Sequence, residues 1–95
     1  MTVPNLGTAR RKEIAEVLAR FGLDDKEQAV YLALLPMGTT ALLPLARASG
    51  LRLTTAQSVI ARLAESGLVE VTKRGSRHAY EAHDPEMLAL ILERQ

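Results

Sequence analysis

The segment TTAQSVIARLAESGLVE, residues 54–70, changes its periodicity at a single glycine. Before Gly67, apolar residues recur at the three- and four-residue spacing of an amphipathic helix. After Gly67, residues 68–72 alternate apolar and polar side chains, which is typical of a half-buried strand. A helix that stops abruptly and passes straight into a strand is expected where the second helix of a helix-turn-helix leads into a β-hairpin wing.

The helix in this segment has two distinct faces. We expect it to begin at Thr54 and to end at Ser66–Gly67, because the spacing from Thr54 to Gln57 matches a capping box. On a helical wheel its apolar side consists of Ala56, Val59, Ile60 and Leu63. The side opposite carries Thr54, Thr55, Ser58, Ala61 and Arg62. A helix with these faces packs on a core and presents hydroxyl groups and a cation to a partner.

Two further helices are predicted before residue 39. Residues 8–21 carry one apolar stripe, with Thr8 as the expected cap and Phe21 as part of the core. Asp24, followed by Glu27 three residues later, predicts a capping box at the start of a second helix. That helix is apolar almost all round, as expected of the central helix of a small bundle.

A short third helix is predicted over TTALLPLARASG, residues 39–50. Pro44 fits it only in the first turn, where a missing N–H leaves no hydrogen bond unmade. Gly50 supplies the C-terminal stop and a turn residue tolerant of positive φ. Ala46 is small enough to lie where this helix crosses the next.

The rest of the chain predicts a hairpin and a last helix. Residues 68–82 contain two alternating runs around the glycine-centred turn KRGSR, with Tyr80 expected in the core. Asp84–Pro85 is a cap followed by a first-turn proline, which predicts a helix over 85–95. The predicted fold is mainly α with a β-hairpin, a winged helix-turn-helix with extra N- and C-terminal helices.

Composition sets the class of protein. Ninety-five residues predict one domain over 1–95, with residues 1–7 as a loose lead-in. Hydrophobic residues make up 47% and aromatic residues 3%, so we expect an aliphatic, helix-rich core. The absence of cysteine excludes disulfides and thiolate chemistry and fits a reducing cytoplasm. The longest apolar run, residues 29–35, is too short to cross a bilayer, so no membrane partner is expected.

Positive charge is concentrated in one part of the sequence. The net charge is only +1, yet residues 47–80 contain six basic residues against two acidic ones, a net charge of +4. The residues after this segment carry −3, and those before it are neutral. A local basic region of this kind is the electrostatic signature of a nucleic-acid-binding surface.

The candidate DNA contacts lie on the polar helix face and in the hairpin turn. Glutamine can pair with the edge of adenine and arginine with that of guanine, while small hydroxyl groups permit close approach to the major groove. Cations in the turn can bind phosphates or enter the adjacent minor groove. The predicted site consists of Arg52, Thr54, Thr55, Gln57, Ser58, Arg62, Lys73, Arg74 and Arg77.

The stretches FGLDDKEQAVYLALLPMG, LARASGLRLTTAQSVIARLAESGLVEV and HAYEA make residues 21–83 similar to the winged-helix domain of TrmB-type regulators, a family of mainly archaeal and bacterial transcription factors. The resemblance implies sequence-specific DNA binding as a homodimer, with the helix from Thr54 as reader. Arg52 stands where the family often has proline, Gln57 where an aromatic is common and Pro44 where an acidic residue is usual. Because of these departures, the operator sequence cannot be inferred from the family. The family's sugar-binding domain is not found in this sequence, so no effector is predicted.

The sequence carries few signals of other functions. No phosphate-binding loop, activated nucleophile or carboxylate pair occurs, so neither an enzyme nor a cofactor is expected. His78 and His83 are an odd number of residues apart in an extended segment, so they should point to opposite faces rather than share a metal. The alternative is a protein–protein interaction or assembly module without specific DNA binding, because Leu42 and Leu43 cannot both easily face the core.

The expected partners are double-stranded DNA and a second copy of the chain. Residues 8–21 and 85–95 are the candidate dimerisation helices, since Ile14/Val17/Leu18/Phe21 and Met87/Leu88/Ile91/Leu92 offer more apolar surface than one small core needs. A protein with these partners is expected in the cytoplasm, associated with the nucleoid.

Overall fold

The structure, a computed structural model, describes residues 8–93. Within this range the helices and strands are α1 (Thr8–Arg20), α2 (Asp25–Leu34), the 3-10 turn η1 (Leu35–Met37), β1 (Thr39–Thr40), α3 (Leu42–Ser49), α4 (Leu53–Glu65), β2 (Val69–Arg74), β3 (Arg77–Ala82) and α5 (Pro85–Glu93). The predicted mainly helical fold with a hairpin is confirmed. The lead-in predicted for residues 1–7 lies outside the described residues.

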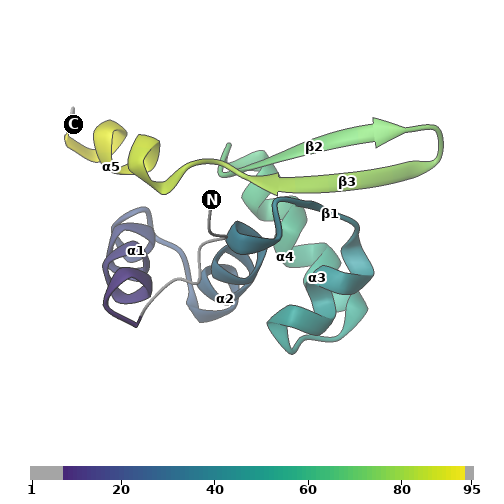
Figure 1. Cartoon of the computed structure of the whole chain (residues 1–95), viewed down its shortest axis with the longest axis horizontal. Coiled ribbons are helices and arrows are strands. Elements are labelled where there is room, and N and C mark those ends of the chain that lie inside the picture. The colour runs from purple at the N-terminus through teal and green to yellow at the C-terminus, as the bar shows by residue number, and fades with distance from the viewer. Residues whose placement is uncertain (1–7, 94–95) are drawn as a thin grey trace.

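Helices α1 to α4 form one layer beneath the long hairpin of β2 and β3, and α5 lies at the level of the hairpin, beyond its base (Figure 1). α2 contacts α1, α3, α4 and β3, which confirms its prediction as the central helix. α1 and α5 contact each other at one end of the molecule, and the hairpin extends toward the other end, over α3 and α4 (Figure 1). The helix-turn-helix and the wing are therefore separated from the terminal helices along the long axis.

The start of α2 has the predicted capping box. The backbone N–H of Glu27 donates to Asp24 Oδ1 at 2.8 Å, and the N–H of Asp24 donates to Glu27 Oε1 at 2.9 Å. Each side chain thus satisfies a backbone donor that the first turn of a helix leaves unpaired.

A third strand was not predicted. Thr39 and Thr40 were expected in the third helix, but they form β1, which pairs antiparallel with β3 through Thr39↔Glu81 and Thr40↔Tyr80. The sheet order is β1-β3-β2. Two β-branched residues favour extended backbone, and their partners lie some forty residues further along the chain, so local sequence carries little trace of the pairing. α3 begins after them, with Pro44 in its first turn as predicted.

The turn between α3 and α4 depends on Gly50. Its φ of 71° lies in the left-handed region that glycine enters without steric cost, and its N–H caps the end of α3. Arg52 is then extended, with φ −65° and ψ 151°, and serves as the N-cap residue of α4 without a side-chain hydrogen bond. The prediction of Thr54 as cap is therefore wrong, because the extended backbone at Arg52 lets the helix begin at Leu53.

The hydrophobic core is mainly aliphatic, as the composition predicted, although Tyr31 is also fully buried in it. The predicted apolar stripe of α4 is confirmed, since all four of its side chains are at most 1% exposed. Phe21 and Tyr80 pack against the core while remaining partly exposed. Other core side chains include Ile14, Leu18, Val30, Tyr31, Leu34, Leu45, Leu68 and Leu88.

The hairpin has the predicted turn. Residues 74 and 77 are the last paired positions, leaving Gly75 and Ser76 as a two-residue turn. Gly75 has φ 63°, and Ser76 does not have positive φ, the combination that type II′ hairpin turns require. β2 and β3 therefore stay paired up to the tip.

α5 begins at Pro85 after Asp84, as predicted, and Asp84 Oδ1 accepts the backbone N–H of Glu86 at 2.8 Å. Leu88 is buried, whereas Met87 and Leu90 are 58% and 53% exposed. The side chains of Ile91 and Leu92, also expected on the apolar face, lie outside what the structure describes. No helix within residues 8–93 is long and apolar enough to span a membrane.

Candidate nucleic-acid interface

The predicted reading residues of α4 face solvent. Thr54, Gln57, Ser58 and Arg62 are exposed, and Thr55 is half-buried. Thr54 and Ser58 lie on the side of α4 opposite the four core residues. Thr55, Gln57 and Arg62 flank them, so the helix presents a polar face that is largely exposed. The major groove of DNA is wide enough to accept one α-helix that presents such a face.

One flank of this face meets the start of α2. A hollow of about 310 Å³ is lined by Lys26 of α2 together with α4 residues Thr54, Thr55, Ser58, Val59 and Arg62. Lys26 was not among the predicted site residues. Its charge was visible in the sequence, but its position beside α4 depends on how α2 and α4 pack.

The other flank meets the sheet. A hollow of about 240 Å³ lies between Gln57, Ile60, Ala61 and Ala64 of α4 and Val71, His78 and Tyr80 of the hairpin. Gln57 therefore faces the hairpin, whereas Thr55 and Arg62 face α2. The exposed face of α4 lies between these two hollows.

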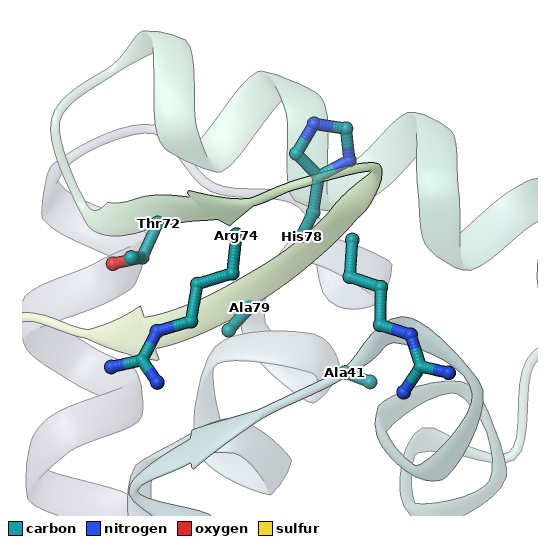
Figure 2. Close-up of a pocket in the computed structure, with 6 residues that line it drawn as sticks. Ala41, Thr72, Arg74, His78 and Ala79 are labelled. Carbon is teal, nitrogen blue, oxygen red and sulfur yellow. The ribbon is translucent and has the colours of Figure 1, made fainter.

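The wing, which is the β2–β3 hairpin, carries its cations on both faces. Lys73 is paired with His78 and lies two residues from Val71, so it shares the face turned toward α4. Arg74 is paired with Arg77 and shares the opposite face with Thr72 and Ala79. Figure 2 shows His78 on one side of the hairpin and Arg74 and Thr72 on the other. The three predicted wing cations are thus divided, not grouped.

The face with the two arginines borders a hollow of about 500 Å³ against the start of α3. Ala41 and Ala79 line it together with Thr72, Arg74, Arg77 and His78 (Figure 2). The guanidinium groups are exposed, and the small alanine side chains leave the space between the sheet and α3 open. A negatively charged group can therefore approach both arginines from this side.

Arg62 has protein partners. Its Nε lies 3.5 Å from Glu27 Oε2, and its Nη2 lies 4.0 Å from Asp24 Oδ2. The side chain is nevertheless 52% exposed. The sequence identified Asp24 and Glu27 as caps of α2 but gave no sign that they pair with a residue of α4.

The N-terminal end of α4 adds a cation and an apolar side chain. Arg52, the N-cap residue, is exposed, and Leu53 after it is 47% exposed. Leu53 was not predicted as a contact. An apolar side chain at this end of a reading helix can contact the methyl group of thymine.

The base of the wing is anchored by Tyr31. Its side chain is fully buried and its hydroxyl donates to the backbone carbonyl of His83, directly after β3. Burial, and to a lesser extent the Asp84 carboxylate, raise the pKa of the Tyr31 hydroxyl well above its usual value. Tyr31 therefore stays protonated and ties α2 to the junction between the wing and α5.

The two histidines lie near opposite ends of β3. His78 is exposed on the wing, with its ring centroid 6.5 Å from that of Tyr80, and His83 lies beyond the end of β3. Among the residues that the structure describes, no three histidine, cysteine, aspartate or glutamate side chains are grouped so that they could hold a metal ion.

A helix pair joined by a short glycine turn and followed by a two-stranded wing is a winged helix-turn-helix, a fold found in DNA-binding transcription regulators. The model of the family described as "Sugar-specific transcriptional regulator TrmB" matches residues 18–86. The chain belongs to the TrmB family, as its sequence predicted.

Individual relatives agree with this assignment. The HTH-type sugar sensing transcriptional regulator TrmBL1 of Pyrococcus furiosus is 31% identical over 77 residues, which are 81% of this chain and 22% of that protein. The structure of TrmBL2, described as an archaeal chromatin protein, superposes with a TM-score of 0.74 at 21% identity, covering 88% of this chain and 32% of that one. The chain thus spans less than a third of the length of either protein.

A shorter protein offers a similar match. The winged helix-turn-helix DNA-binding domain (fragment 1–100) from Mycobacterium bovis, described as homodimeric and as a possible ArsR-family regulator, is 29% identical with a TM-score of 0.58. The match covers 94% of this chain and 87% of that domain. The winged-helix fold is therefore common to relatives of different families.

Proposed function

We propose that this chain binds double-stranded DNA in a sequence-specific manner and acts as a transcriptional regulator. The observation that carries the proposal is the position of the exposed polar face of α4, between Lys26 on one side and the Lys73 face of the wing on the other. A polar helix flanked by cations fits a major groove, whose two edges are rows of phosphates.

Each part of this surface has a proposed role. Thr54, Gln57 and Ser58 contact base edges, and Leu53 contacts a thymine methyl group. Arg52 and Lys26 bind phosphates on either side of the helix, which fixes its position without reading sequence. These roles follow from exposure and from position on α4, since the reading residues lie in its first two turns.

The wing contacts DNA with both of its faces. Lys73 lies on one face and Arg74 and Arg77 on the other, so a hairpin lying along or within the minor groove places cations toward both phosphate-lined walls. A hairpin with all its cations on one face would bind only one strand in this way.

The proposed active form is a homodimer on nucleoid DNA. Met87 and Leu90 expose apolar surface on α5, which packs on α1 at the end of the molecule far from the tip of the wing (Figure 1). Ile14 and Leu18 of α1 do not contribute, because the subunit's own core buries them. Dimers of this kind place their reading helices about 34 Å apart, which favours a pseudo-palindromic target.

The test is a mobility-shift titration with genomic fragments at several salt concentrations. We expect binding that survives competitor DNA and weakens steeply with salt, by about 0.9 in the log–log slope for each phosphate contact. Sequencing the retained fragments then gives the operator. No retardation of any fragment at low salt would contradict the proposal.

A second candidate, protein docking, is favoured by Leu43. It is 47% exposed in the first turn of α3, whereas its neighbour Leu42 packs on the core, as the sequence predicted for one of the pair. This candidate predicts that Leu43→Ser abolishes capture of a specific protein partner and leaves DNA affinity unchanged. Loss of DNA affinity in that variant would assign Leu43 to the DNA interface instead.

A further inference from the structure

The two carboxylates of the α2 capping box, those of Asp24 and Glu27, also form ion pairs with Arg62 on the exposed face of α4. Each of its carboxylates uses one oxygen for the backbone: Asp24 Oδ1 accepts from Glu27, and Glu27 Oε1 accepts from Asp24. The remaining oxygens, Asp24 Oδ2 and Glu27 Oε2, are the two that lie 4.0 Å and 3.5 Å from the Arg62 guanidinium. Arg62 is therefore held at a preformed site with two negative charges.

The partners differ in their freedom to move. Glu27 is 17% exposed and both of its oxygens have partners, so its carboxylate is fixed in place. Arg62 is 52% exposed and its long side chain borders the same hollow as Thr55 and Ser58. Arg62 can therefore leave its partners and reach a ligand on the α4 face, whereas Glu27 cannot follow it.

We propose that Glu27 is a specificity-determining residue, because it competes with DNA phosphates for Arg62. The inference rests on the proposed function. A partly exposed ion pair and a single phosphate contact have similar strength, so a phosphate gains little by displacing Glu27. A bidentate contact to guanine makes two hydrogen bonds in a geometry that only this base offers, so the correct base, unlike a single phosphate contact, can displace Glu27 from Arg62. Binding to incorrect sequences is weakened more than binding to the operator, which increases specificity.

The test uses Glu27→Gln. Glutamine also serves in capping boxes, so its amide oxygen can still accept the Asp24 N–H while the negative charge is removed. On random-sequence duplex we expect affinity to rise roughly two- to fivefold. The log–log salt slope should steepen by about 0.9, because Arg62 gains a phosphate. Affinity for the operator should rise less, so the specificity ratio falls.

Three further variants separate the possible causes. Arg62→Ala alone should leave the salt slope on random DNA unchanged, and in the Glu27→Gln background it should remove the gain. Glu16→Gln removes the same charge from an exposed position on α1 and should leave the specificity ratio unchanged. Asp24→Asn should have a smaller effect than Glu27→Gln, since Asp24 is 60% exposed and its contact to Arg62 is longer.

The outcomes distinguish this proposal from the proposed function. Two results would contradict the role of Glu27 while leaving the proposed DNA binding intact. One is a salt slope on random DNA that is lower by about 0.9 in Arg62→Ala. The other is a rise in affinity in Glu27→Gln that persists when Arg62 is also replaced by alanine. If no variant binds DNA at low salt, both fall together. Circular dichroism checks the fold, and should Glu27→Gln not fold, the slope of Arg62→Ala decides alone.

Discussion

The reading helix and the wing form one proposed surface but are held in place in different ways. Four side chains of α4 are at most 1% exposed and lock the helix into the core. In β2 only Val69 is buried, and every residue from Glu70 to the turn is exposed. The outer wing is therefore held by strand pairing and by the Gly75 turn rather than by burial.

This difference separates stability from binding. Hydrophobic burial stabilises α4, so a change to its inner face disturbs the position of the reading residues along with the fold. The wing tip, residues 73–77, contributes charge and little packing, so its substitution should change DNA affinity and leave the fold intact.

The largest effect is expected on the inner face of α4. Leu63→Ala should lower the free energy of unfolding by about 2–5 kcal/mol, because it removes a buried side chain and leaves a cavity. Ser58→Ala, on the exposed face, should change it by less than about 0.5 kcal/mol. Urea denaturation measures both. Equal losses would show that the two faces are not distinct.

The wing should show the reverse behaviour. The double variant Lys73→Ala/Arg74→Ala should reduce the log–log salt slope of DNA binding by about 1.8, and its urea midpoint should match that of the unsubstituted protein. The single variants sharpen the comparison, since the two residues lie on opposite faces. A fall of about 0.9 in each single variant means that both faces contact phosphates; an unchanged slope in the double variant refutes the wing's role.

The base of the wing is expected to depend on one buried hydrogen bond. Tyr31→Phe removes the donor to the His83 carbonyl and should cost about 0.5–1.5 kcal/mol of unfolding free energy. The loss should be smaller than that of Leu63→Ala, because the ring and its packing remain. No loss at all would mean that the base of the wing is not anchored through this bond.

Ionisation of Tyr31 should also make the free energy of unfolding depend on pH in alkaline solution. The folded protein raises the pKa of Tyr31 above the value of about 10 expected in the unfolded chain, so folding favours the protonated hydroxyl. This contribution is fully present below pH 10, and it is lost as the pH rises from there toward the folded-state pKa. Unfolding free energies measured from pH 8 to 11 should therefore fall less steeply in Tyr31→Phe than in the unsubstituted protein.

The smallest effect is expected at the start of α4. Thr54→Ala should change the unfolding free energy by less than about 0.5 kcal/mol, because Thr54 is not the N-cap residue. Asp24→Ala, at a true N-cap, should cost about 1 kcal/mol. An equal loss of unfolding free energy in Thr54→Ala and Asp24→Ala would mean that Thr54 does cap α4, as the sequence predicted.

The features that the sequence predicted correctly are local ones. The capping box at Asp24, the turn at Gly50 and the hairpin turn at Gly75 each depend on residues within about four positions. The buried stripe of α4 follows from helical periodicity alone. Such features can be predicted from the sequence because they form without contacts to distant parts of the chain.

The features that it missed depend on distant contacts. β1 requires β3, and the pairing of Arg62 with Glu27 requires α2 and α4 to pack in one particular way. Lys26 enters the site for the same reason. The division of the wing cations between two faces could have been predicted from the sequence, since adjacent strand residues such as Lys73 and Arg74 point to opposite faces.

The central claim is that the exposed face of α4 and the wing tip bind one DNA duplex together. An NMR titration of the isotope-labelled protein with an operator duplex tests it directly. We expect the backbone amide signals of residues 53–58 and 73–77 to shift together at the same DNA concentration, while those of α1 stay in place. Shifts confined to one of the two regions, or strongest in α1, would contradict it.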